Sequence, residues 1–137
     1  MIAPDTSVVL AALAPWHVGH PVASDALSDA PARSMVTHVA FETTSTLSRM
    51  PEGERIAAAT VYQALESLFP GDWLQLGATD ARRALATAVA AGVRGGALYD
   101  AVIAATAHAH GARLLSFDRR ALSTYEAIGV EVEMLTA

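Results

Sequence analysis

The stretch ALYDAVIAATAHAHGARLLSFDRR, residues 97–120, decides the fold of this chain. It predicts a helix over about 97–110, a turn at the glycine that follows, and a strand over Arg113–Ser116. From Asp100 the helix descends roughly 15 Å at about 1.5 Å per residue, and the strand climbs back on the order of 17–20 Å at about 3.3 Å per residue. Asp118 therefore returns to the level of Asp100, and the two carboxylates are expected at the same edge of a sheet.

The rest of the chain alternates short strands with helices in the same way. This alternation predicts parallel pairing through right-handed crossovers, and hence a three-layer α/β/α fold with a central, mostly parallel sheet. No linker or repeat interrupts it, so residues 1–137 are expected to form a single domain. The other expected strands are Ile2–Pro4, 34–37 and 130–134, a short strand could lie at 73–76, and the other expected helices are 6–14, 19–28, 39–50, 54–69, 79–91 with Thr79 as its cap, and 119–128.

Composition narrows the classes of protein to which the chain can belong. Nine basic residues, all of them arginine, face fourteen acidic ones, and the resulting net charge of −5 argues against a general nucleic-acid coating protein. It permits an enzyme that grips RNA through a few local arginines. Cysteine is absent, which excludes disulfides, thiolate zinc sites and cysteine nucleophiles. No apolar run approaches the roughly 20 residues that span a bilayer, and no signal peptide is evident, so a cytoplasmic protein without a membrane role is expected.

Four carboxylates, distant in sequence, are predicted to meet at one edge of the sheet. Asp5 ends the first strand, Glu42 lies near the start of the helix after the second, and Asp100 and Asp118 occupy the edge described above. Ionised carboxylates a few ångströms apart raise one another's pKa unless a cation neutralises them. An all-oxygen cluster suits Mg²⁺ or Mn²⁺, and such an ion can contact a phosphate and activate water for in-line attack on a phosphodiester.

The residues around these acids resemble the motifs of PIN domains. Any one of the motifs is weak evidence, but four in this order, covering essentially the whole chain, are specific. Ser116 departs from the pattern, since many relatives carry threonine there, although a hydroxyl is kept. The matching stretches are IAPDTSVVL at 2–10, VTHVAFE at 36–42, YDAVIAATA at 99–107 and LLSFDRRA at 114–121, followed by Tyr125 and IGVEV at 128–132.

The small size further resembles the VapC toxins of bacterial toxin–antitoxin pairs. That resemblance implies a Mg²⁺- or Mn²⁺-dependent endoribonuclease that cleaves tRNA or ribosomal RNA, forms a homodimer, and is held inactive by a VapB-type antitoxin. By motif position, Asp5, Asp100 and Asp118 would hold the metal most directly, and Glu42 would bind through water or orient the nucleophile. The residues expected to hydrogen-bond these carboxylates are Thr6, Ser7 and Ser116, and the arginines expected to contact RNA are Arg94, Arg119 and Arg120.

Other functions stay open to different degrees. A phosphatase or phosphoaspartate receiver would want a lysine, which the chain lacks, and the phosphatase pattern also wants an acid where Ser7 stands. A catalytically weak, partner-binding scaffold and a nuclease acting on DNA both remain, since chemistry at the phosphate does not distinguish the sugars. His38, four residues before Glu42, could touch substrate.

Two expectations concern the protein partner. An antitoxin arginine could sit among the carboxylates in place of the metal. Apolar side chains on the early helices could form the antitoxin or dimer interface, although the sequence does not separate them from the core; they are Val22, Leu27, Val61 and Leu65.

Overall fold

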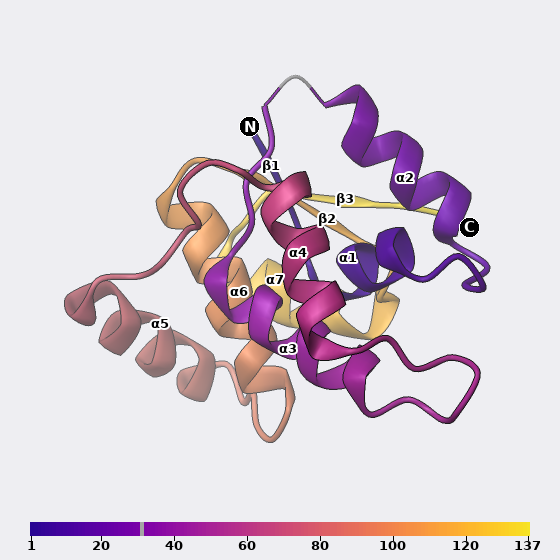
Figure 1. Ribbon diagram of the computed structural model, residues 1–137. Coiled ribbons are helices and arrows are strands. Elements are labelled where there is room, and N and C mark those ends of the chain that lie inside the picture. Colours follow the sequence, from indigo (N-terminus) through magenta and orange to yellow (C-terminus); the bar gives the residue numbers. More distant parts are fainter. Residues whose placement is uncertain (31) are drawn as a thin grey trace.

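A three-stranded parallel sheet forms the centre of the protein (Figure 1), in a computed structural model that describes residues 1–30 and 32–137. The strands are β1 (Ile2–Pro4), β2 (Arg113–Ser116) and β3 (Val132–Met134), in the order β1-β2-β3. Ala3 pairs with Leu114, and Leu115 with Glu133. The central strand β2 therefore pairs with one strand from each end of the chain, and its carboxyl end lies beside that of β1.

The expected strands at 34–37 and 73–76 are wrong, because each contributes only an isolated bridge. Arg33 pairs in parallel with Ile2, whereas Val36 pairs in parallel with Leu74. The segment thus changes partner within three residues, and helix α3 begins at Thr37, so no continuous ladder forms. These bridges still extend the parallel arrangement beyond the free side of β1.

Helices surround the sheet, and both α1 and α6 contact β2. The predicted α/β/α class is confirmed, with differences at helix ends. One helix begins at Ala58 instead of residue 54, because the Glu54 and Arg55 amides donate to Pro51 O in a turn. Gly77, and not Thr79, caps the fifth helix. The helices are α1 (Thr6–Leu13), α2 (His20–Asp29), α3 (Thr37–Ser48), α4 (Ala58–Leu68), α5 (Ala78–Ala90), α6 (Ala97–Ala109), the 3-10 turn η1 (Arg119–Ala121) and α7 (Leu122–Ile128).

The hydrophobic core lies between the sheet and the helices. Leu27, Val61 and Leu65 are buried in it, so of the two alternatives left open for these three residues the core is correct and the exposed interface is wrong. Val22 is partly buried. Each buried aliphatic side chain of this size stabilises the fold by about 1.5–3 kcal/mol. Within the described residues, none of the helices combines the length and the apolar character needed to cross a membrane.

Candidate active site

Asp5 is the fixed acid of the site. It follows β1, and its backbone amide continues the sheet by donating to Leu115 O at 2.9 Å. Its side chain caps α1, with Oδ1 accepting from the amide of Val8 at 3.3 Å and from the hydroxyl of Ser7. The hydroxyl of Tyr125 donates to Oδ2 at 2.7 Å. With only 2% of its surface exposed, Asp5 is held in one orientation by these donors.

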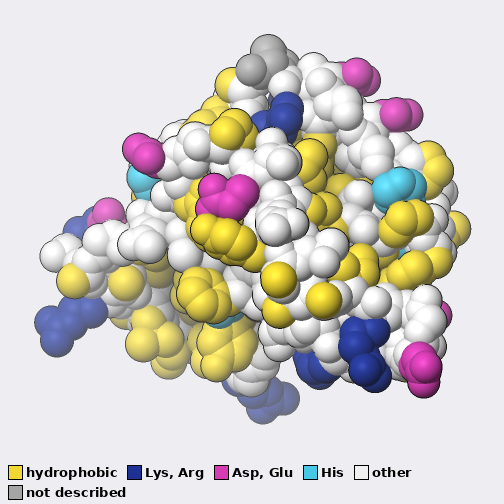
Figure 2. All heavy atoms as spheres, viewed as in Figure 1, with side chains coloured by type: hydrophobic (Ala, Val, Ile, Leu, Met, Phe, Trp, Pro, Cys, Tyr) yellow, Lys and Arg dark blue, Asp and Glu magenta, His cyan; other side chains and the backbone are white. Residues whose placement is uncertain are grey.

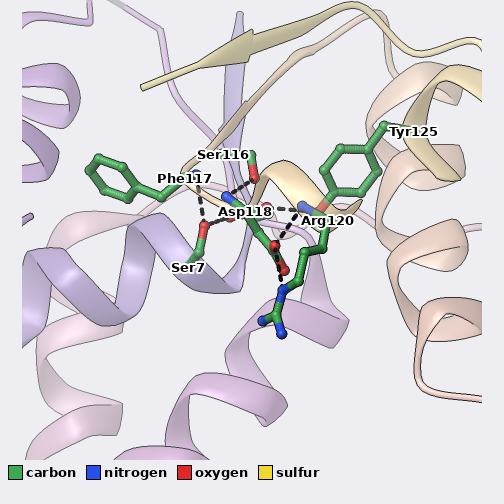
Figure 3. A network of polar contacts seen from close by, with 7 residues as sticks. Ser7, Ser116, Phe117, Asp118, Arg120 and Tyr125 are labelled. Carbon is green, nitrogen blue, oxygen red and sulfur yellow. Dashed lines mark hydrogen bonds and ion pairs between the residues drawn. The ribbon is translucent and has the colours of Figure 1, made fainter. Parts of the chain in front are cut away.

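The end of β2 supplies the second acid (Figure 3). Asp118 lies two residues beyond the strand, and its amide donates to the buried hydroxyl of Ser116 at 2.9 Å. Ser7 joins the two strand ends, because its hydroxyl donates to Asp5 and accepts from the amide of Phe117 at 2.9 Å. These bonds fix the spacing between the first and the last acidic motif.

Glu42 reaches the site from α3. The hydroxyl of Thr6 donates to Glu42 Oε1 at 3.1 Å, which ties α3 to the start of α1. His38 lies one helical turn earlier, with Nε2 3.4 Å from the same oxygen. The imidazole of His38 also stacks on Tyr99, with ring centroids 5.2 Å apart and planes inclined by 10°. The three predicted hydroxyl side chains Thr6, Ser7 and Ser116 thus all lie among the acids.

Asp100 lies in the first turn of α6, close enough to the other three acids for their charges to affect its pKa. Its pKa is raised from 3.8 to about 6, first by burial and then by the charges of Glu42, Asp118 and Asp5. The guanidinium of Arg120 opposes this rise. The charges of acids from three other elements therefore act on Asp100 at the sheet edge.

Burial also raises the pKa of Asp5, and hydrogen bonds from Ser116, Ser7 and Tyr125 oppose it. The pKa of the Tyr125 hydroxyl is raised by burial and by the adjacent charge of Asp5, so the hydroxyl remains a donor. Sequence reasoning gave Tyr125 no role. The available signal was that a tyrosine in an apolar helix turn needs a partner for its hydroxyl when it is buried.

The chemistry of these donors fits a hard divalent cation, because all are oxygens and a cation would relieve the repulsion that raises the pKa of Asp100. Among the described residues, no group of three or more His, Asp or Glu side chains is already arranged to hold one ion.

The three predicted arginines differ in their placement. Arg120 lies at the site: its amide donates to Asp118 Oδ1 at 3.0 Å and its Nε lies 3.5 Å from the same oxygen. Arg119 is exposed at the start of η1, and Arg94 is exposed on the segment before α6. Only Arg120 is tied by a described contact to one of the acids.

Comparison with known proteins places the chain in a family. Residues 2–127 match the PIN domain, and the chain belongs to the PIN-domain family. It is 43% identical to Ribonuclease VapC40 of Mycobacterium tuberculosis, over 99% of this chain and 100% of that protein. It is 36% identical to Ribonuclease VapC27 of the same organism, over 96% of this chain and 94% of that protein. The resemblance to VapC-type PIN domains is confirmed.

Solved structures share the fold at lower sequence identity. FitAcB from Neisseria gonorrhoeae superposes with a TM-score of 0.69 and 22% identity, covering 96% of each chain. VapBC2 from Rickettsia felis, bound to a DNA fragment from its promoter, gives a TM-score of 0.71 with 15% identity, covering 99% of this chain and 100% of that one. These likenesses establish the architecture.

Proposed function

We infer that this protein is a metal-dependent endoribonuclease toxin of the VapC type, which hydrolyses phosphodiester bonds in RNA. The observation that carries the proposal is the meeting of four carboxylates from the end of β1, α3, α6 and the end of β2. Burial, and then the charges of the other three acids, raise the pKa of Asp100 to about 6. Relatives named as VapC ribonucleases, matched over nearly the whole chain, support it.

Mg²⁺ or Mn²⁺ is the proposed cofactor, with Asp5, Asp100 and Asp118 as its holders. A bound divalent cation would polarise a phosphate and activate water for attack on phosphorus. Asp5 contributes an immobile carboxylate, since Ser7 and Tyr125 fix it. Asp100 and Asp118 are only partly buried, so their carboxylates are accessible to an ion from solvent.

Glu42 is proposed to bind the cation through water or to orient the attacking water molecule. Its Oε1 is held by the hydroxyl of Thr6, which leaves Oε2 free of any described hydrogen bond. Arg120, which contacts Asp118, and the exposed Arg94 and Arg119 would contact phosphates around the scissile bond. Exposed guanidinium groups suit this role, because the chain as a whole is acidic and needs local positive charge.

The proposed substrate is a structured RNA, either tRNA or ribosomal RNA, and the proposed inhibitor is a cognate VapB-type antitoxin acting on a cytoplasmic homodimer. The antitoxin is expected to place an arginine among the carboxylates, where it would neutralise the charge that the cation otherwise neutralises. Structural neighbours described as the complexes FitAB and VapBC2 support a protein partner.

A catalytically weak scaffold is the second candidate, favoured by the absence of a ready-made site for one ion among the described residues. Incubation of total cellular RNA with purified protein in Mg²⁺, Mn²⁺ or EDTA separates the two. Asp118→Asn tests the site more cleanly than a substitution of Asp5. Asp5 also caps α1, so its replacement would disturb folding as well as the site. Asp25→Asn, at an exposed acid of α2, is the matched control.

Discrete RNA fragments that require the metal, vanish with Asp118→Asn and persist with Asp25→Asn are the expected result. Mapping their ends would name the RNA and the bond. Absence of cleavage under every metal, by protein that is folded and binds a partner, would favour the scaffold. Equal cleavage by wild type and Asp118→Asn would mean that the site is wrongly placed.

A further inference from the structure

A groove beside the carboxylates is lined by aromatic side chains. It lies between α3 and the start of α6, has a volume of about 370 Å³, and includes His38, Phe41, Glu42, Arg49 and Tyr99 in its walls. Glu42 belongs both to this groove and to the acidic cluster. We call these five residues the aromatic groove. Because Glu42 is common to both, the groove adjoins the candidate active site.

Two of the rings in the aromatic groove are unusually open to solvent. Phe41 is 71% exposed and Tyr99 is 57% exposed, although each adjoins one of the four acids in sequence. Stacking on His38 orders the Tyr99 ring while leaving more than half of the residue accessible. Figure 2 shows hydrophobic side chains spread over the face that α3, α4 and α5 form. Exposed, pre-ordered rings are what a stacking ligand requires.

Arg49 adds positive charge at the far end of the groove. It follows the last residue of α3, seven residues after Glu42, which places it roughly 10 Å further along the helix at about 1.5 Å per residue. It is exposed and lines the groove. Aromatic rings, acid and guanidinium therefore follow one another along α3, from His38 and Phe41 through Glu42 to Arg49.

This order matches the chemistry of a single RNA strand. Single-strand binders hold the sugar-phosphate backbone by positive charge and stack bases on aromatic rings. A protein of net charge −5 without lysine cannot gain much affinity from general attraction to phosphate, so stacking has to supply a larger share. A protein partner would not need the rings and Arg49 to lie on opposite sides of the acid in this way.

We propose that the aromatic groove binds an unpaired base adjacent to the scissile phosphate, with the base stacked on Tyr99 beside Phe41 and a phosphate on the other side of the acids near Arg49. This inference rests on the proposed nuclease function. It implies that the RNA is unpaired at the position where it is cut. Tyr99 is then a positioning residue, because it aligns the strand for chemistry that occurs at the four acids.

The test uses a single-stranded RNA 10-mer that carries 2-aminopurine, whose fluorescence is quenched by stacking. Binding is measured in an Asp118→Asn background, which keeps the groove and leaves the RNA uncut. We expect Tyr99→Ala to abolish the protein-induced quenching and to weaken binding by roughly 5- to 150-fold, the range for loss of one base stack. Tyr99→Phe should retain both. Tyr62→Ala is the matched control, since Tyr62 on α4 is 56% exposed outside the groove.

An abasic 10-mer extends the test to the RNA side. The parent protein should bind it more weakly by a similar factor, whereas Tyr99→Ala should bind the abasic and intact strands equally. Phe41→Ala provides a second variant in case Tyr99→Ala does not fold. Equal binding of the intact strand by parent and Tyr99→Ala would overturn the proposal. So would a change in the mass of the protein assembly on Tyr99→Ala without a change in RNA binding, because the rings would then serve a protein interface.

The outcomes for the groove and for the nuclease are separable. Tyr99-dependent quenching, found together with absence of cleavage by the wild-type protein, would uphold the groove and refute the nuclease. Metal-dependent cleavage together with RNA binding that does not depend on Tyr99 would uphold the nuclease and refute the groove.

Discussion

Replacing Asp100 by asparagine should stabilise the metal-free protein at neutral pH. Burial, followed by the charges of Glu42, Asp118 and Asp5, raises the pKa of Asp100 from 3.8 to about 6. The folded protein therefore keeps a proton that the unfolded chain releases, and stability is lost as pH rises from about 4 to about 6. Above pH 6 the carboxylate is ionised in the folded protein and the full loss of stability is present. A neutral amide at this position does not ionise, so the variant avoids this loss.

The magnitude follows from the rise in pKa. An increase from 3.8 to about 6 corresponds to about 3 kcal/mol, at about 1.36 kcal/mol for each pKa unit. Asp100 is only partly buried, and solvent screening reduces the expected effect to on the order of 1–1.5 kcal/mol. The amide keeps the shape of the carboxyl group, so packing should change little.

Urea unfolding followed by circular dichroism measures this difference. In EDTA at pH 7.5, Asp100→Asn should exceed wild type in its free energy of unfolding by about 1–1.5 kcal/mol, and at pH 4 by about 0.5 kcal/mol or less. Asp25→Asn, on α2, should show no such pattern. The reasoning fails if Asp100→Asn is equal to or less stable than wild type at pH 7.5, or if its advantage is as large at pH 4.

Three further changes have expected outcomes. Ser7→Ala should lower the free energy of unfolding by about 1–3 kcal/mol in urea, because it deprives both Asp5 and a backbone amide of a partner. Tyr125→Phe should cost about 1.5–3 kcal/mol at pH 7, since it removes a donor to a buried carboxylate, and less at low pH. Arg120→Ala should raise KM for RNA by roughly tenfold in low salt and less in high salt, with Arg82→Ala on α5 as control.

Each of these outcomes can be contradicted directly. An unchanged urea midpoint for Ser7→Ala would mean that water replaces the hydroxyl between the strand ends. A cost for Tyr125→Phe that does not depend on pH would show that the hydroxyl does not stabilise ionised Asp5. A KM effect for Arg120→Ala that is insensitive to salt, or matched by Arg82→Ala, would exclude a phosphate contact.

The segment 97–118 was predictable because its signals are local. The expected strand Arg113–Ser116 has the same bounds in the structure, and the helix α6 ends one residue before the expected end. Glycine at 111 adopts a φ of 67° and closes the turn between them. Since helix rise and strand rise are fixed by backbone geometry, the return of Asp118 to the level of Asp100 followed from residue counting alone.

The errors involve partners that are distant in sequence. Residues 33–36 have the composition of a buried strand, but their pairing is divided between Ile2 and Leu74, and no local pattern shows this division. Val61 and Leu65 on α4 form an apolar stripe that could face either a partner or the core, and packing against α3 places it in the core. Burial of an amphipathic helix depends on what covers it.

The same distinction applies to the site. The four acids could be placed from strand ends and helix starts, which are properties of the sheet edge. The bond from Tyr125 to Asp5 joins residues 120 positions apart, and it depends on how α7 packs against α5 and α6. The sequence shows that residue 125 is a tyrosine, but not that its hydroxyl points toward Asp5.

The site divides its acids into one that is buried and three that are only partly buried. Donors hold both oxygens of Asp5, whereas Glu42, Asp100 and Asp118 are partly open to solvent, and the charges of the other acids act on Asp100. Folding without metal therefore leaves repulsion at the sheet edge, and a cation would return that free energy as binding affinity. For this reason Asp100→Asn should move two quantities in opposite directions, raising the stability of the metal-free protein while weakening its affinity for Mg²⁺ or Mn²⁺.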